Sequence, residues 1–173
     1  MLSLDEKIEE RLKELNEKDK QIVQKFFTNS EILDKIFAVV RKNFELIEPM
    51  GNYNSDLMIV VNDDISLNNK VIQIVKAFFD TNGVNMYDTY ITTYAKTNND
   101  TINQTLIQKE IQVLNPRRII GLGVDGCSNS LTKEEYNLFK SCLGDAEKIN
   151  TEEYKAIKAK FISLIKYIIT GEE

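Results

Sequence analysis

Three polar residues directly follow a continuous apolar run in the sequence. Residues 57–61 read Leu-Met-Ile-Val-Val, and Asn62, Asp63 and Asp64 come next. An apolar run of this length is typical of a strand that is buried on both faces. Ligands of open α/β sheets bind at the carboxyl ends of the strands, where a carboxylate could position a water molecule or a magnesium ion. Asp and Asn also form good turns and helix caps. Taken alone, these three residues favour a turn or a cap over a ligand site.

A glycine-rich segment follows a second apolar run. Gly121 to Gly126 reads Gly-Leu-Gly-Val-Asp-Gly and matches the G-x-G-x-x-G pattern of phosphate-binding turns. The pattern normally follows the first strand and opens a helix at once, whereas here a polar stretch separates it from a helix predicted to begin at Thr132. We therefore favour a flexible strand-to-helix loop and keep nucleotide binding as an alternative.

The composition excludes several kinds of chemistry. The 173 residues contain no histidine, which removes Ser-His-Asp and Cys-His catalysis and every imidazole acid or base. Cys127 and Cys142 have neither the number nor the spacing of a zinc or iron–sulfur site, so we expect no metal and no cofactor. The net charge is −5 and there is no block of basic residues, so we expect DNA binding, if any, to be weak. We expect a cytoplasmic protein with no membrane partner.

The elements that must position these residues fall into two parts. Residues 1–48 predict an N-terminal helical segment that packs on the core and offers a surface to a protein partner. Ser3 and Glu6 form a capping box, and Ser30 is predicted to begin a later helix. Four apolar residues then recur at helical spacing in the first of these helices: Leu4, Ile8, Leu12 and Leu15.

Residues 49–173 alternate between predicted strands and helices. This rhythm predicts a three-layer αβα fold with a small central parallel sheet and helices on both faces. The predicted strands are 56–62, 88–94 and 117–122. Asn68 is predicted to cap the helix after the first strand, and a capping box at residues 132–135 is predicted to open a later helix. A fourth short strand is predicted around residues 147–149.

Three of these segments resemble the uracil-DNA glycosylase superfamily. Residues 56–60 (D-L-M-I-V) are similar to its first strand, and residues 90–96 (Y-I-T-T-Y-A-K) to its second, commonly Y-I-T-N-x-x-K. Residues 114–123 (L-N-P-R-R-I-I-G-L-G) resemble its third, L-x-P-R-x-I-x-x-L-G. The resemblance implies the family's αβα fold over roughly residues 50 to 169.

The departures from the family pattern concern the catalytic residues. The loop after strand one normally reads G-E-A-P-G or G-Q-D-P-Y, and here it reads V-N-D-D-I. Asp63 falls where a water-activating Asp stands in some branches, which makes it the catalytic candidate. Thr93 replaces the Asn that pairs with uracil, and the family's His-Pro-Ser segment has no counterpart between Gly144 and Tyr154. One oxyanion-hole-type donor is worth about 2.7–4 kcal/mol, so the losses argue against full activity.

The sequence therefore predicts a catalytically degenerate uracil-DNA glycosylase-like protein. It would bind or scaffold in the DNA metabolism of a virus or mobile element rather than act as an enzyme. One alternative is a divergent active glycosylase that uses Asp63, and another is a nucleotide-binding protein that uses the Gly121 to Gly126 loop. Lys96 is the cation best placed to meet a DNA phosphate. The candidate substrate-binding residues are Asn62, Asp64, Thr93, Lys96, Gly121 and Gly123.

Overall fold

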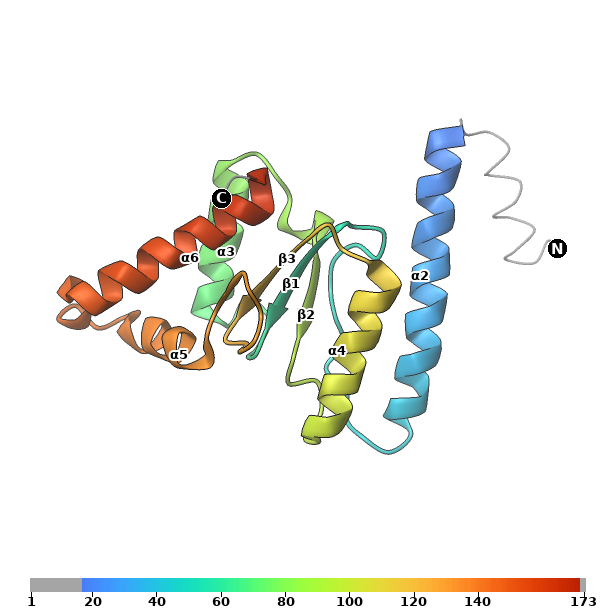
Figure 1. Ribbon diagram of the computed structural model, residues 1–173, viewed down its shortest axis with the longest axis horizontal. Helices are drawn as coiled ribbons and strands as arrows, with labels where there is room; N and C mark the ends of the chain where they lie inside the picture. Colours follow the sequence, from blue (N-terminus) through green and yellow to red (C-terminus); the bar gives the residue numbers. More distant parts are fainter. Residues whose placement is uncertain (1–16, 172–173) are drawn as a thin grey trace.

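The computed structural model describes residues 17–171, with side chains from residue 28 onward, and has an α/β fold (Figure 1). The predicted helix with Leu4, Ile8, Leu12 and Leu15 lies outside the described residues. Two short 3₁₀ turns, Met86–Asp88 and Lys148–Asn150, accompany the regular elements. In chain order, the α-helices and strands are α2 (Glu17–Arg41), β1 (Leu57–Val61), α3 (Lys70–Thr81), β2 (Tyr90–Thr93), α4 (Asp100–Leu114), β3 (Arg118–Leu122), β4 (Ser130–Leu131), α5 (Lys133–Cys142) and α6 (Glu152–Thr170).

The four strands form one parallel sheet in the order β2-β1-β3-β4. Each of the three predicted strands is present and parallel, so this part of the sequence prediction is confirmed. Beyond β1 the chain passes through α3 to β2 on one side, and beyond β3 it leads to β4 on the other. The loops after β1 and β3 therefore diverge, although the two strands are neighbours. Such a point is where open α/β sheets bind ligands.

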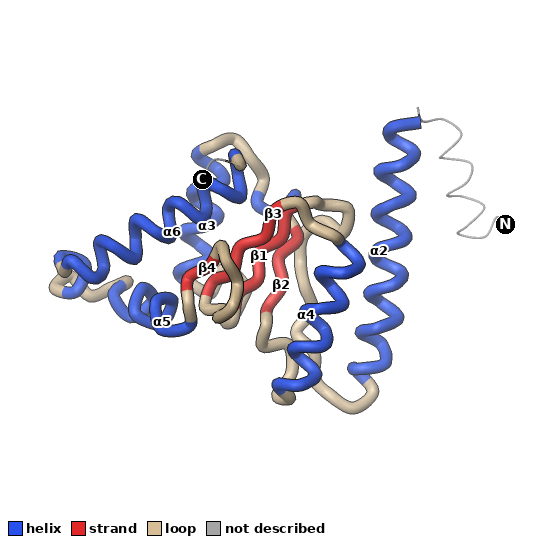
Figure 2. Tube along the Cα trace, viewed as in Figure 1, coloured by secondary structure: helices blue, strands red, loops and turns tan. Residues whose placement is uncertain are grey.

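Helices cover both faces of the sheet, with α3, α5 and α6 on one side and α4 and α2 on the other (Figures 1 and 2). The side chains of β1 alternate between these layers because successive residues of a strand point to opposite faces. Ile59 and Val61 pack with α3, α5 and α6, whereas Met58 and Val60 pack with α2 and α4. This explains the continuous apolar run of β1. Within the described residues, no helix combines the length and apolarity needed to cross a membrane.

The outer edge of β2 is covered by an extended segment that precedes β1. Met50 and Ile91 exchange two backbone hydrogen bonds of 2.8 Å, and the amide of Ile47 donates to the carbonyl of Lys96. Gly51 follows with φ +96°, and a Cβ there would lie 1.9 Å from the carbonyl oxygen of Thr89. Only glycine fits this close approach, which blunts an edge strand that would otherwise be open to another chain.

Three local predictions are wrong. Ser30 begins no helix, because α2 runs unbroken through it; burial of Leu33 and Phe37 outweighs the small helix penalty of one serine. Asn69, not Asn68, caps α3, since the Asn69 side chain accepts from the amide of Val71. The segment 147–149 forms a 3₁₀ turn rather than a strand, because the Asp145 carboxylate accepts from two amides that follow it.

Candidate functional site

The Asp63 side chain lies at the carboxyl end of β1, where residues from four elements meet. Its Oδ2 accepts hydrogen bonds from Oη of Tyr136 at 2.8 Å and from Nζ of Lys140 at 2.5 Å, both on α5. Its Oδ1 accepts from the amide of Asp64 at 2.8 Å. Oγ1 of Thr93, at the end of β2, donates to the Asp63 carbonyl at 3.0 Å. We name Asp63, Tyr136 and Lys140 the Asp63 cluster.

These contacts change the acid–base properties of Asp63. Burial alone would raise the pKa of the carboxyl, but the bonds from Lys140, the Asp64 amide and Tyr136 outweigh it and hold the pKa below its usual value. Burial and the neighbouring Asp63 charge raise the pKa of Tyr136, despite a hydrogen bond from Asn69 that lowers it. Asp63 is therefore ionised at neutral pH, and it is a weaker base than a free carboxylate.

The position of α5 follows from its sequence. Thr132 and Glu135 form the predicted capping box, with both reciprocal hydrogen bonds present. Tyr136 and Lys140 are four residues apart and so lie on one face of the helix. Gly123, with φ +82°, lies against this face, and a Cβ there would be 3.1 Å from Cγ of Tyr136. The glycine thus lets the loop after β3 touch the tyrosine ring.

Asn69 joins the start of α3 to the same cluster. Its Nδ2 lies 2.7 Å from the Asp64 carbonyl, 3.0 Å from Oη of Tyr136 and 3.5 Å from Oδ2 of Asp63. Its Oδ1 caps the helix. One amide side chain therefore fixes the β1 loop, the α3 terminus and the tyrosine together.

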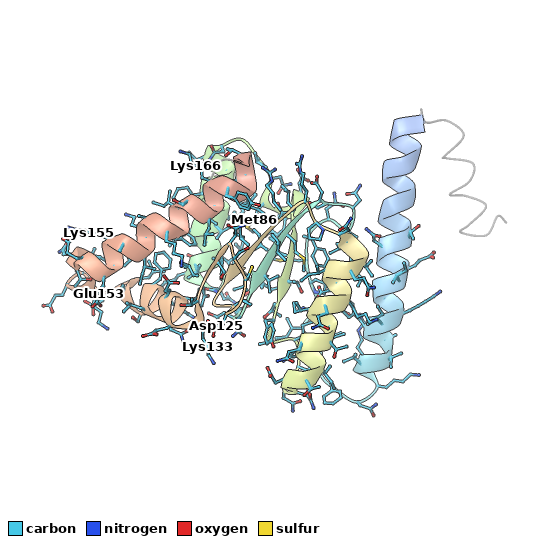
Figure 3. The ribbon with its side chains drawn as sticks, in the orientation of Figure 1. Met86, Asp125, Lys133, Glu153, Lys155 and Lys166 are labelled. Atoms are coloured by element: carbon cyan, nitrogen blue, oxygen red, sulfur yellow. The ribbon has the colours of Figure 1, made fainter. Side chains whose placement is uncertain are left out.

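A crevice of about 320 Å³ opens where the loops after β1 and β3 diverge, and Asp100 and Gln104 of α4 also line it. Asp63, Tyr136 and Lys140 are not part of this lining. Asn62 comes from the first loop, and Gly123 and Asp125 come from the second, with Tyr94 and Lys133 completing much of the lining. Asp125 and Lys133 lie beside one another near α5 (Figure 3), and Oδ1 of Asp125 accepts from the Lys133 amide at 3.0 Å. An amide, an aromatic ring and charges of both signs suit a small polar ligand.

The structure brings some of the predicted site residues together and separates others. Asn62 and Gly123 line the crevice, and Asp63 and Thr93 lie at the same edge. Asp64 is exposed, and its carboxylate accepts from the amide and hydroxyl of Ser66, so it forms a local turn. Gly121 is a paired residue inside β3, where it gives room to Ser130 and Val124 and is not part of the site.

Lys96 does not lie where a DNA phosphate could reach it. Its side chain is fully buried, with Nζ 2.5 Å from Oε1 of Glu110 and 2.5 Å from the carbonyl of Thr93. Oη of Tyr90 donates to the other oxygen of Glu110 at 2.5 Å. Burial lowers the pKa of Lys96, and Glu110 only partly offsets this. The expectation that Lys96 is a surface cation is corrected, because it ties β2 to α4 inside the core.

The glycine-rich loop also differs from a dinucleotide-binding turn. It leads from β3 into β4 before α5 begins, so the glycines do not open a helix. Gly123 is used to approach Tyr136, and Gly126, with φ +80°, has no atom within 4 Å of its Cβ position. The loop thus lacks the strand-to-helix geometry on which pyrophosphate binding depends.

Sequence reasoning missed Tyr136, Lys140 and Asn69. The capping box at Thr132 predicted α5, and Tyr136 and Lys140 are four residues apart within that helix. No local signal showed that this face meets Asp63, which lies more than seventy residues away in the chain. Asn68 and Asn69 are the same residue type at adjacent positions, and the cap of α3 was predicted at Asn68 instead of Asn69.

Within the residues that the structure describes, no group of three or more Cys, Asp or Glu side chains is arranged to hold a metal ion. In comparisons with known proteins, no family model matches the sequence and no curated protein matches it either.

Proposed function

We propose that this protein is a uracil-DNA glycosylase-like α/β domain that does not excise uracil and acts in DNA metabolism by binding. The parallel sheet, the helices on both faces and the place of Asp63 after β1 support the family resemblance of residues 56–60, 90–96 and 114–123. The Asp63 cluster carries the argument against catalysis.

A general base must offer a lone pair within hydrogen-bond reach of the water that it activates. Oδ2 of Asp63 already accepts from Tyr136 and Lys140, and Oδ1 accepts from the Asp64 amide. The lowered pKa weakens the carboxylate as a base in addition. Three hydrogen bonds thus occupy most of the acceptor positions of Asp63, which in this state is an ion-paired carboxylate and a poor general base.

The groups that would assist excision are also engaged or missing. The Thr93 hydroxyl donates to the Asp63 carbonyl, so its hydrogen is not available to read a base. The sequence has no histidine to stabilise a departing uracil anion. If two such donors are lost at about 2.7–4 kcal/mol each, the rate falls by roughly four orders of magnitude or more.

The alternative of a divergent glycosylase rests on one observation. Asn62, which precedes Asp63 in the chain, lines the crevice at the carboxyl edge of the sheet and offers an amide to a ligand there. A substrate that displaced Lys140 would restore a free carboxylate there.

Release of uracil from single- and double-stranded DNA, scored as alkali-labile sites with stoichiometric protein, separates the two functions. We expect no release above background. Asp63→Asn removes the candidate base, and Asp64→Asn at the adjacent exposed carboxylate is the matched control. Rapid release that is lost in Asp63→Asn and kept in Asp64→Asn would establish the glycosylase instead.

The binding part of the proposal has its own test. A titration of the same labelled DNAs at two salt concentrations should show weak binding with a shallow salt slope of about −0.9 per phosphate contact on duplex DNA. Lys133→Ala, at the crevice, should weaken binding more than Lys76→Ala, whose ammonium pairs with Asp80 on α3. Absence of any binding at low salt would reject DNA as the ligand.

A further inference from the structure

An apolar groove runs between α2 and α4 on the face of the molecule opposite α6. Its volume is about 520 Å³. The two helices lie side by side and run in opposite directions (Figure 1). The apolar residues of its lining are Ile36, Val39, Val40, Phe44, Ile102 and Leu106.

The groove between α2 and α4 is suited to bind a third helix. Val39 lines the groove, is 64% exposed and is flanked there by other apolar residues. An amphipathic helix that lays an apolar stripe into such a groove is a common mode of protein recognition, with anchors about four residues apart.

The chain itself contains a segment with this pattern. Leu4, Ile8, Leu12 and Leu15 recur at helical spacing within a predicted helix that begins with the Ser3 capping box. A helix from residue 4 to residue 15 would be about 18 Å long. The first sixteen residues carry five acidic and three basic side chains, and the groove presents one cation, Lys109. The segment therefore fits the groove in apolar spacing and in charge.

The segment of the same copy cannot reach the groove as a helix. It joins α2 at Glu17, and the 19 residues from there to Ile36 extend about 28 Å at 1.5 Å per residue. A helix that folded back along α2 would end after about 18 Å, roughly two turns short of Ile36.

We propose that the groove binds the N-terminal segment of a second copy of this chain. The two copies then exchange their segments in a closed two-fold dimer, in which each groove is filled by the partner. The inference is independent of the function proposed above. It concerns the groove between α2 and α4, and its test measures the molecular mass of the protein in solution.

Sedimentation equilibrium of the full-length chain over a range of concentrations measures the mass directly. We expect a dimer for the unmodified chain. Val39→Asp in the groove and Leu12→Asp in the segment should each raise the dimer dissociation constant at least tenfold, because a charge would be buried in an apolar contact. Ala38→Asp and Lys13→Asp introduce the same side chain at neighbouring positions and should leave the dimer unchanged. Thermal unfolding checks each variant, and the exposure of Val39 means that Val39→Asp should remain folded.

A mixture of the two variants tests the exchange itself. Val39→Asp keeps an intact segment and Leu12→Asp keeps an intact groove, so the mixed pair retains one of the two contacts. With the variants carrying different fluorophores, mixed dimers should form at concentrations where each variant alone is monomeric. A monomeric unmodified chain, a dimer that both variants preserve, or a mixture that stays monomeric would each overturn the proposal.

Discussion

Replacing Glu110 by glutamine should strongly destabilise the fold. The carboxylate is completely buried between β2 and α4, and it holds Nζ of Lys96 at 2.5 Å and Oη of Tyr90 at 2.5 Å. Glu110→Gln keeps the shape but leaves the Lys96 ammonium without a counter-charge in the core. The Thr93 carbonyl and the new amide oxygen can still accept hydrogen bonds from the ammonium, but neither carries a negative charge.

The expected cost follows from the burial of both groups. Removing one partner of a buried ion pair typically costs about 3–5 kcal/mol, because the other charge stays desolvated and uncompensated. A domain of this size has about 5–15 kcal/mol of stability in total. Glu110→Gln should therefore remain folded in water but unfold at a much lower urea concentration, with an unchanged dependence of the free energy on urea.

Replacing Lys96, Glu110 and Tyr90 together by apolar residues should lower the free energy of unfolding far less than replacing Glu110 alone. Lys96→Met, Glu110→Leu and Tyr90→Phe together leave no buried charge and no unpaired hydroxyl, and such replacements are often neutral or stabilising by about 1–4 kcal/mol. Urea unfolding followed by circular dichroism measures both variants. If Glu110→Gln costs less than about 1 kcal/mol, or if the triple variant is the less stable of the two, the charges are not desolvated as the structure indicates.

Two further outcomes concern the Asp63 cluster. Because the folded pKa of Asp63 lies below the unfolded value of 3.8, its stabilisation is present above pH 3.8 and is lost as the pH falls through the folded pKa. Lys140→Met should therefore lower the free energy of unfolding by about 0.2–1 kcal/mol at pH 7, and this effect should shrink as the pH falls below 3.8, whereas Lys133→Met on the same helix should show no such pH dependence. Gly123→Ala should cost about 1–3 kcal/mol, because φ is +82° and the new Cβ meets the Tyr136 ring at 3.1 Å; Gly126→Ala, with a similar φ but open space, is the control in urea unfolding.

The elements that could be predicted are those specified by adjacent residues. β1 is a continuous apolar run because helices cover both of its faces, and α5 begins at a capping box whose two hydrogen bonds are both local. Ser30 was wrongly predicted to begin a helix because a serine that favours caps also tolerates a helix interior when neighbouring residues are buried.

Lys96 shows why the site was harder to predict. A lysine after a strand is normally a surface cation, and its burial depends on Glu110, which lies on another element. One signal was available: Glu110 stands in helical register with the buried Leu106, Ile107 and Leu114. An acidic residue on the inner face of a helix requires a buried partner, and the sequence alone does not say which one.

Asp63 and Glu110 are each held by one lysine and one tyrosine, yet only one of them can change partners. The Glu110 pair is fully buried, so separating it would leave two desolvated charges. The Asp63 side chain is 23% exposed and that of Lys140 is 46% exposed, so water can solvate both groups when they separate. Such a pair contributes about 0.2–1 kcal/mol. A ligand that supplied its own hydrogen-bond donor could displace Lys140 at that small cost, whereas no ligand could open the Glu110 pair without unfolding the surrounding core. The exchangeable carboxylate directly follows Asn62, which lines the crevice, and this supports the proposal that a ligand binds at the carboxyl edge of β1.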